Sequence, residues 1–246
     1  MKTNSKHLGL VTKKFNEFFF VDLKNKKNFG NSERFLCKVR KSINFKDQFI
    51  YVGDEVEIDN IDLTSKRAVI ASLKKRQNLL NRPSVANISN IYITFSVEEP
   101  KLNLSQVNRF LISAESMGVE VSLVLTKCDL ISDKKQIFLL DKFKKWGYQA
   151  IILNLHKSDH FEDLLAQLKK KKCSIFMGPS GVGKTTLLNK IIPGLQNSTA
   201  PVSNKIKRGK NTTRNVELFS ISNQSYIVDT PGFNMQPLEV DIKLLP

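Results

Sequence analysis

The residues at 178–185 read Gly-Pro-Ser-Gly-Val-Gly-Lys-Thr, and their types and spacing suit the binding of phosphate. They fit the pattern G-x-x-x-x-G-K-[ST], in which glycines let consecutive backbone N–H groups turn inward around phosphate oxygens. Lys184 would reach the outer phosphates of a nucleotide, and the Thr185 hydroxyl would hold Mg²⁺. The alternative is a Gly-Ser-Pro turn that fits by chance. The predicted nucleotide-binding residues of this loop are Gly178, Pro179, Ser180, Gly181, Val182, Gly183, Lys184, Thr185 and Thr186.

The stretches on either side of the loop have the character that this chemistry needs. A short, mostly apolar run at 173–177 suits a buried strand, and residues 186–192 have the apolar spacing of a helix that begins at Lys184. A helix that starts directly after the glycines adds the positive end of its dipole to the phosphate site. Strand, glycine loop and helix together predict a P-loop.

A second motif follows the apolar run at 119–125, at the predicted carboxyl end of a strand, where open α/β sheets bind ligands. Its residues Thr126, Lys127, Cys128 and Asp129 resemble the guanine-reading N/T-K-x-D motif of GTPases. A carboxylate there can accept hydrogen bonds from guanine N1–H and the exocyclic amine, a donor pair that adenine lacks. The lysine stem would lie over the base, and Thr126 replaces the usual asparagine with a shorter side chain. The alternative is an ordinary surface loop.

A third motif, Asp229-Thr230-Pro231-Gly232, follows the strand-like run at 225–228. It resembles the D-x-x-G motif of GTPases, in which the aspartate reaches Mg²⁺ through water and the glycine N–H meets the γ-phosphate. A strand followed by a Pro-Gly turn is the alternative. Thr213 or Thr212, in a basic segment at 205–214, could complete the Mg²⁺ shell. Lys184, Thr213 and Gly232 are thus the predicted catalytic residues, and the predicted metal ligands are Thr185, Thr213 and Asp229.

The order of the motifs along the chain is unusual, because the guanine-reading motif precedes the P-loop. Ordinary GTPases have the P-loop first, so this order resembles that of circularly permuted GTPases. Such a permutation is structurally inexpensive, since domain termini usually lie close together and the nucleotide loops meet at one sheet edge. The sequence predicts an α/β fold, a circularly permuted P-loop GTPase domain preceded by a small OB-fold-like β-barrel.

The combination of permuted order, GPSGVGKTTLLN at 178–189, the segment at 208–214 and DTPGF at 229–233 resembles the RsgA (YjeQ) family. RQNLLNRPSVAN at 76–87 also resembles the junction that precedes the GTPase domain in that family. The resemblance implies binding of GTP, GDP and Mg²⁺, and GTP hydrolysis stimulated by the small ribosomal subunit. It also implies a role in late (30S) maturation of that subunit and contact with its rRNA.

The chain departs from the family pattern at two places. Asn211 stands where the family usually has a histidine before the switch threonines. The family also carries a C-terminal zinc-binding segment, and clustered Cys and His residues of that kind do not occur before Pro246, so we expect no zinc site in this chain. Phe233, which follows D-x-x-G, cannot orient an attacking water as a glutamine could. Asn211 and Phe233 together predict a slow intrinsic reaction, for which the partner supplies or orders the missing group.

The composition limits the number of domains, the class of protein and the kind of partner. The 246 residues suffice for two domains, and 41% hydrophobic with 25% charged residues is usual for a globular protein. The net charge of +16 favours a polyanionic partner such as RNA, although lysine-rich codon usage is an alternative. Three well-separated cysteines and no long apolar run predict a cytoplasmic protein with neither disulfides nor membrane contact. We expect a monomer.

Residues 1–75 are expected to form the barrel and residues 76–246 the GTPase domain, with a linker at 74–83. Five strands are predicted at 8–11, 18–23, 35–40, 54–58 and 68–73. Basic residues gather here at Lys24, Lys26, Lys27, Lys38, Arg40 and Lys41. Phe18, Phe19, Phe20 and Phe35 could stack on bases, although phenylalanines on strands more often belong to a core.

In the GTPase domain, strands are predicted at 90–96 and 149–153, and helices at 103–118, 133–146 and 161–172. Asn103 and Gln106 are placed as in a capping box, and Gly147 would end the second helix. Two other functions fit the same motifs: a GTP-gated RNA-binding checkpoint with little intrinsic hydrolysis, and a P-loop ATPase or kinase with an unrelated barrel.

Overall fold

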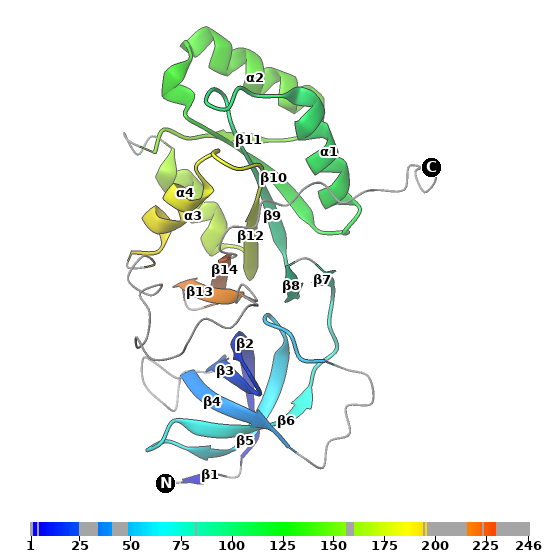
Figure 1. Ribbon diagram of the computed structural model, residues 1–246, viewed down its shortest axis with the longest axis vertical. Helices are drawn as coiled ribbons and strands as arrows, with labels where there is room; N and C mark the ends of the chain where they lie inside the picture. The colour runs from blue at the N-terminus through cyan, green and yellow to red at the C-terminus, as the bar shows by residue number, and fades with distance from the viewer. Residues whose placement is uncertain are drawn as a thin grey trace, which may run out of the picture. The chain divides into compact units, whose positions relative to one another are not determined.

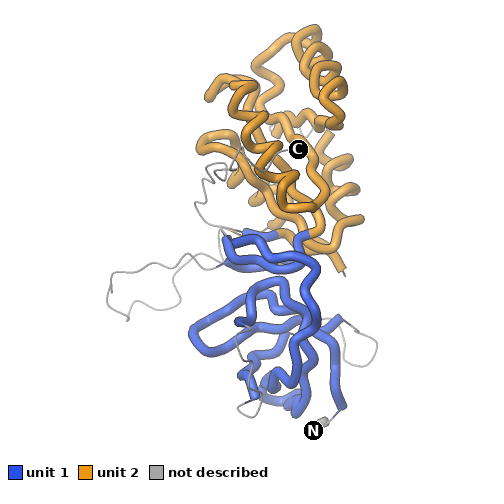
Figure 2. Tube along the Cα trace, turned by 90° about the vertical axis from the view of Figure 1, so that its right-hand side faces the viewer, with its two compact units in different colours: residues 1–88, 214–220, 228–231 blue, residues 89–213, 221–227, 232–246 orange. Residues whose placement is uncertain are grey.

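The computed structural model describes residues 2–3, 5–24, 34–40, 49–81, 83–155, 160–193, 195, 216–222 and 224–229 (Figure 1). The chain divides into two compact units, drawn in blue and orange in Figure 2. Unit 1 comprises residues 1–88, 214–220 and 228–231, and unit 2 comprises residues 89–213, 221–227 and 232–246. The predicted domain boundary at 75/76 lies within unit 1.

Unit 1 contains a closed barrel of five strands. Its strands are β2 (His7–Phe15), β3 (Phe18–Leu23), β4 (Arg34–Val39), β5 (Glu55–Asp62) and β6 (Arg67–Leu73), and the two-residue strand β1 (Lys2–Thr3) pairs with β5. The order β5-β6-β4-β3-β2 closes through antiparallel pairing of β2 with β5, and β4 and β6 are parallel. This is the five-stranded Greek-key arrangement of an OB-fold, so the prediction of an OB-fold-like barrel is confirmed.

Alternating side chains fill the barrel. In β3 every second residue is buried, because successive side chains of a strand point to opposite faces. Phe19 (6% exposed) and Phe35 (0%) belong to the core, so these two are not available to stack on bases. Phe18 and Phe20 are half-buried, and the Lys38 ammonium lies 4.7 Å from the centroid of the Phe18 ring.

The stretch expected to be a linker is folded against the barrel. Strands β7 (Leu79–Asn81) and β8 (Ser84–Ala86) form a hairpin, and Val85 bridges Val52 in a barrel loop. Gly53 approaches this hairpin so closely that an added Cβ would lie 2.1 Å from the carbonyl oxygen of Ala86. The hairpin is therefore part of unit 1, and tertiary contacts rather than its own length hold it in place.

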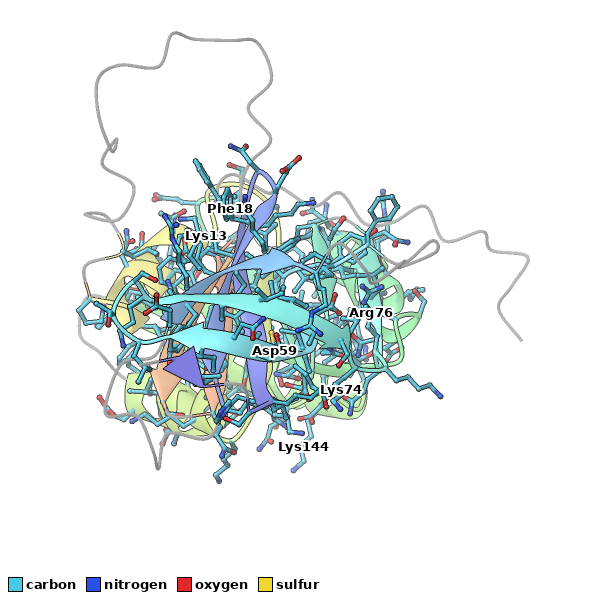
Figure 3. All side chains as sticks on the ribbon, turned by 90° about the horizontal axis from the view of Figure 1, so that it is seen from below. Lys13, Phe18, Asp59, Lys74, Arg76 and Lys144 are labelled. Atoms are coloured by element: carbon cyan, nitrogen blue, oxygen red, sulfur yellow. The ribbon has the colours of Figure 1, made fainter. Side chains whose placement is uncertain are left out.

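Arg76, labelled in Figure 3, fixes the start of this stretch through an ion pair with the buried Asp54. Its Nε donates to Asp54 Oδ1 at 2.6 Å and its Nη2 to Asp54 Oδ2 at 2.8 Å, while the guanidinium stacks 4.8 Å from the Tyr51 ring. The Asp54 side chain is completely buried. A bidentate partner is needed because an isolated carboxylate could not be buried at acceptable cost.

Unit 2 is built on parallel strands in the order β12-β9-β10-β11, and β14 is the neighbour of β12. β9 pairs in parallel with β10 and β12, and β10 with β11. All seven residues of β9 are buried, as expected for a strand in the middle of a sheet covered on both faces. The strands that lie wholly in unit 2 are β9 (Asn90–Ser96), β10 (Glu120–Thr126), β11 (Ala150–Ile152) and β12 (Cys173–Met177). Strands β13 (Glu217–Ser222) and β14 (Ser225–Asp229) each contribute residues to both units.

Within the described residues, the connections between these strands contain four helices and one 3₁₀ turn. They are α1 (Leu104–Glu115), η1 (Cys128–Leu130), α2 (Asp133–Lys145), α3 (Phe161–Lys169) and α4 (Lys184–Ile191). The connections through α1 and α2 advance in one direction along the sheet and the connection through α3 returns, so right-handed crossovers place α3 on the opposite face (Figure 1). No helix among the described residues is long and apolar enough to cross a bilayer.

Candidate nucleotide-binding site

The loop between β12 and α4 has a backbone that only glycine can adopt at its first position. Gly178 has φ +150°, and a Cβ added to it would lie 2.0 Å from the carbonyl oxygen of Thr94. Gly183, the residue before α4, has φ +91°. The two glycines let the chain leave a buried strand, pass tightly over β9 and enter the helix, so the N–H groups at the start of α4 are available to an anion.

The Lys184 side chain places its positively charged ammonium group against this loop. Its ammonium donates hydrogen bonds to the carbonyl oxygens of Gly178 (2.8 Å) and Pro179 (2.5 Å), so the side chain folds back over the loop. Burial lowers the pKa of Lys184 from 10.5 to about 8, because the charged form loses hydration. A phosphate group is the partner that would compensate this charge.

The T-K-C-D motif and the P-loop meet in the structure, although they are about 50 residues apart in the chain. The Thr126 hydroxyl donates to the carbonyl oxygen of Val182 at 2.6 Å, and Thr126 is completely buried. Its side chain therefore ties the end of β10 to the phosphate loop and does not itself face a base. This contact holds the segment predicted to read the base against the loop predicted to bind phosphate.

Lys127 precedes the turn η1, which begins with Cys128 and Asp129 of the motif. Lys127 has a left-handed backbone (φ +55°), and its ammonium donates to the carbonyl oxygen of Glu99. Cys128 is buried beneath the turn, and this burial raises the pKa of its thiol to about 11, so it stays a neutral packing group. Asp129 is exposed and available to a ligand.

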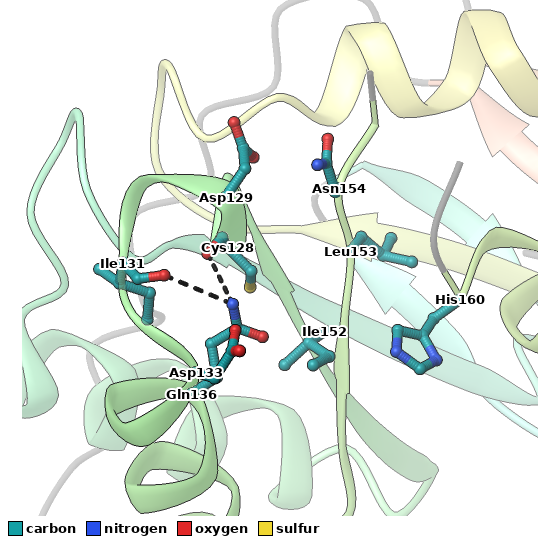
Figure 4. A pocket seen from close by; sticks show the side chains of 9 residues that line it. All are labelled: Cys128, Asp129, Ile131, Asp133, Gln136, Ile152, Leu153, Asn154 and His160. Carbon is teal, nitrogen blue, oxygen red and sulfur yellow. Dashed lines mark hydrogen bonds between the residues drawn. The ribbon is translucent and has the colours of Figure 1, made fainter. Parts of the chain in front are cut away.

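A cavity of about 310 Å³ opens beside Asp129 (Figure 4). In Figure 4 the side chains of Asp129 and Asn154 point to the same side, from η1 and from the segment after β11. Gln136 of α2 closes the wall behind them by donating to the carbonyl oxygen of Cys128 at 2.9 Å. The remaining lining residues are Ile131, Asp133, Ile152, Leu153 and His160.

Two groups at this site were not predicted from the sequence. The loop at 97–102 supplies the Glu99 carbonyl to Lys127, and Glu98 pairs with Lys135 of α2 at 2.8 Å. The Lys190 ammonium of α4 donates to the carbonyl oxygen of Leu155 at 2.7 Å, which links the P-loop helix to the segment after β11. The contacts of Lys127 and Lys190 are made to backbone carbonyls, which leave no pattern in the sequence.

The other predicted residues are placed as follows. Thr185 and Thr186 are exposed in the first turn of α4, and Ser180 and Gly181 are exposed in the loop. Asp229 is half-buried at the end of β14, and β14 is the neighbour of β12 in the sheet. Thr213, Thr212 and Gly232 lie outside the described residues, as do Asn211, Phe233 and His156.

The chain is similar in sequence to GTPases of one family. A family profile described as RsgA GTPase matches residues 73–239. The protein named small ribosomal subunit biogenesis GTPase RsgA from Prochlorococcus marinus strain NATL1A is 44% identical over 219 residues, covering 87% of this chain and 70% of its own. Its namesake in strain NATL2A is 41% identical over 238 residues, covering 94% of this chain and 76% of its own.

Solved structures resemble the fold. The crystal structure of YjeQ from Thermotoga maritima matches with a TM-score of 0.76 and 30% identity, covering 93% of this chain and 76% of the other. A structure described as YloQ, a circularly permuted GTPase, matches with a TM-score of 0.74 over 95% of this chain and 74% of the other. At 24% identity the second match bears on the fold alone. The predicted permuted GTPase fold is thereby confirmed.

Proposed function

Because the chain belongs to the RsgA family of GTPases, we propose that it hydrolyses GTP to GDP and phosphate during maturation of the small ribosomal subunit. Water attacks the γ-phosphorus, and the bond between that phosphorus and the bridging oxygen of GDP breaks. The proposed partner is the small subunit with its rRNA, which stimulates the reaction. The proposed setting is the cytoplasm, where the protein acts as a monomer.

One observation carries this proposal: the 2.6 Å hydrogen bond from the Thr126 hydroxyl to the Val182 carbonyl oxygen. It brings a motif suited to guanine against a motif suited to phosphate, and a single nucleotide needs both. With Asp129 exposed beside the cavity, the site favours guanine over adenine, because only guanine offers two donors to one carboxylate. This arrangement weighs against an ATPase or kinase.

The residues of the P-loop act by positioning and charge. Lys184 and the backbone N–H groups of the loop hold the outer phosphates and stabilise the charge that develops on the γ-phosphoryl group. The donor set fits Mg²⁺, because the exposed Thr185 hydroxyl and the Asp229 carboxylate are hard oxygen ligands of the kind this ion prefers. When bound, Mg²⁺ would neutralise charge between the β- and γ-phosphates. Thr213 is proposed to complete the coordination of Mg²⁺, and the backbone N–H of Gly232 to contact the γ-phosphate.

The barrel is the proposed rRNA-binding unit, as an OB-fold with basic residues on its outside. Within the described residues, Lys38 lies over the half-buried Phe18 ring and is the best placed of the predicted contacts. Lys24 and Arg40 instead pair with Glu55 and Asp59, so part of the expected charge is compensated. We therefore expect a few side chains of the barrel, and not its whole outer face, to contact rRNA.

The test is multiple-turnover GTP hydrolysis with and without purified small ribosomal subunits. We expect a slow reaction alone and a rise of at least tenfold with subunits. ATP in excess should not compete with GTP. An equal rate with and without subunits would overturn the partner-dependent function, and effective competition by ATP would overturn the guanine specificity.

A further inference from the structure

The outer face of α2 combines exposed apolar side chains with lysines, and the proposed nucleotide site does not use it. Ile137 and Phe138 are 59% and 61% exposed, and Leu130, just before the helix, is 47% exposed. The opposite side of α2 packs inward through Leu139 and Phe143. Large apolar side chains grouped on one exposed face mark a surface that another molecule covers.

The lysines of α2 surround the exposed phenylalanine. Lys134 and Lys142 lie one helical turn before and after Phe138, so the three side chains share one face. The Lys142 ammonium lies 5.8 Å from the centroid of the Phe138 ring and 5.9 Å from that of Trp146. Figure 3 shows Lys144 extending away from the ribbon. The helix thus presents an aromatic ring with cations on both sides.

These charges are poorly compensated within the protein. The helix carries five lysines against two aspartates, and among the described residues only Lys135 of the five pairs with a carboxylate. Unit 1 differs, because ion pairs to Asp or Glu engage Lys6, Lys13, Lys24, Arg34, Arg40, Lys74 and Arg76. The positive charge of α2 is therefore available to an external anion.

We propose that the face formed by Lys134, Ile137, Phe138, Lys142 and Lys145 is a second RNA-binding surface, and that it contacts an unpaired stretch of small-subunit rRNA. This rests on the proposed function, which supplies the partner. Lysines neutralise phosphates, and an exposed aromatic ring stacks on an unpaired base, a combination typical of single-strand recognition. A protein partner fits less well, because lysine is depleted in protein–protein interfaces.

The experiment measures binding of the full chain, loaded with a non-hydrolysable GTP analogue, to purified small subunits across a salt titration. Lys134→Gln/Lys142→Gln should weaken binding by about tenfold and reduce the slope of log affinity against log salt by about 1.4. Phe138→Leu should weaken binding by roughly fivefold with the slope unchanged. The control Lys169→Gln/Lys170→Gln removes the same charge from the end of α3 and should bind as the wild type does.

Three outcomes would overturn this proposal and leave the proposed function intact. The α2 variants could bind as the wild type does, or the control could weaken binding as much as they do. A photo-crosslinking residue at position 138 could capture ribosomal protein and no RNA. Guanine-nucleotide affinity and the melting temperature with GDP should stay unchanged in every variant, which separates this surface from the nucleotide site. A wild-type chain that does not bind subunits would overturn both this proposal and the proposed function.

Discussion

The two units bury their strands in different ways. In the barrel strand β3, buried and half-buried residues alternate, whereas all seven residues of β9 in unit 2 are buried. A barrel strand has one face in the core and one face outside, while a central parallel strand is covered on both faces. The barrel strands of unit 1 therefore leave one face open to a partner, whereas the central strands of unit 2 can reach a ligand only at their ends.

The two units also differ in what their buried polar contacts hold together. In unit 1 the ion pair between Arg76 and Asp54 joins the segment before the β7–β8 hairpin to the start of the barrel strand β5. In unit 2 the hydrogen bond between Thr126 and Val182 joins two parts of the proposed nucleotide site. The first should stabilise the fold without touching the ligand, and the second should govern ligand affinity. Variants at each contact should therefore separate loss of stability from loss of ligand affinity.

Arg76→Met should have the largest effect on stability, because it leaves the fully buried Asp54 carboxylate without its cation. We expect a loss of about 3 kcal/mol in the free energy of unfolding, measured by urea denaturation, with GTP affinity little changed. Lys74→Met is the matched control: its pair with Glu57 is partly exposed and should be worth less than about 1 kcal/mol. Equal losses of unfolding free energy in the two variants would contradict the distinction between a buried and a partly exposed ion pair.

Gly178→Ala should damage unit 2. The added Cβ would lie 2.0 Å from the Thr94 carbonyl oxygen at a φ of +150°, so the loop must move. We expect destabilisation of about 3 kcal/mol together with loss of measurable GTP binding. Gly147→Ala, at φ +89° with nothing within 4 Å of the new Cβ, should cost about 1 kcal/mol and leave GTP binding intact. Retained nucleotide binding in Gly178→Ala would argue against this loop as the phosphate site.

Thr126→Val keeps the shape of the side chain and removes the donor to the Val182 carbonyl oxygen. We expect GTP affinity to fall roughly tenfold, since a buried carbonyl left without a donor costs about 1 to 3 kcal/mol. Thr94→Val is the control, because Thr94 is equally buried and its hydroxyl reaches only the carbonyl of Tyr92 at 3.4 Å. Isothermal titration with GDP and GTP distinguishes the two, and equal losses would assign the effect to packing.

The pH dependence of nucleotide affinity should report Lys184. Its pKa is about 8 in the folded protein, below the usual 10.5, so burial of its charge costs stability below pH 8 and that cost disappears as pH rises toward 10.5. A bound triphosphate favours the protonated form, so GTP affinity should fall severalfold between pH 7.5 and 9. Lys184→Gln should bind weakly with a flatter profile over this range. An unchanged slope in that variant would assign the titration to another group.

Long apolar runs were the part of the fold that the sequence predicted best. The bounds of β3 and β9 match the predictions, because each run is bounded by residues that end a strand. Strand β2 extends to Phe15, beyond the predicted end at 11, since a register shift between Val11 and Lys13 lets polar residues continue the ladder. Helix α3 ends at Lys169 and not at 172, within the run of lysines.

The stretch at 74–83 shows where sequence reasoning stops. Nothing local predicts the β7–β8 hairpin, whose three-residue strands depend on Gly53 and Val52, about 30 residues away. The same applies to the site. Glycine spacing indicated the phosphate loop, but the carbonyl of Glu99 that holds Lys127 and the carbonyl of Leu155 that holds Lys190 are backbone groups. Their identity is independent of residue type, so only the folded chain reveals them.

Base specificity tests the central claim most directly, namely that residues 126–129 and 178–185 enclose one guanine nucleotide. The measurement is competition of GTP, XTP and ATP for the wild type and for Asp129→Asn, at fixed salt and Mg²⁺. We predict that the wild type prefers GTP and that Asp129→Asn binds XTP better than GTP, because an amide can donate to the xanthine oxygen where the carboxylate accepted from the guanine amine. An Asp129→Asn variant that still prefers GTP as strongly as the wild type does would contradict the account.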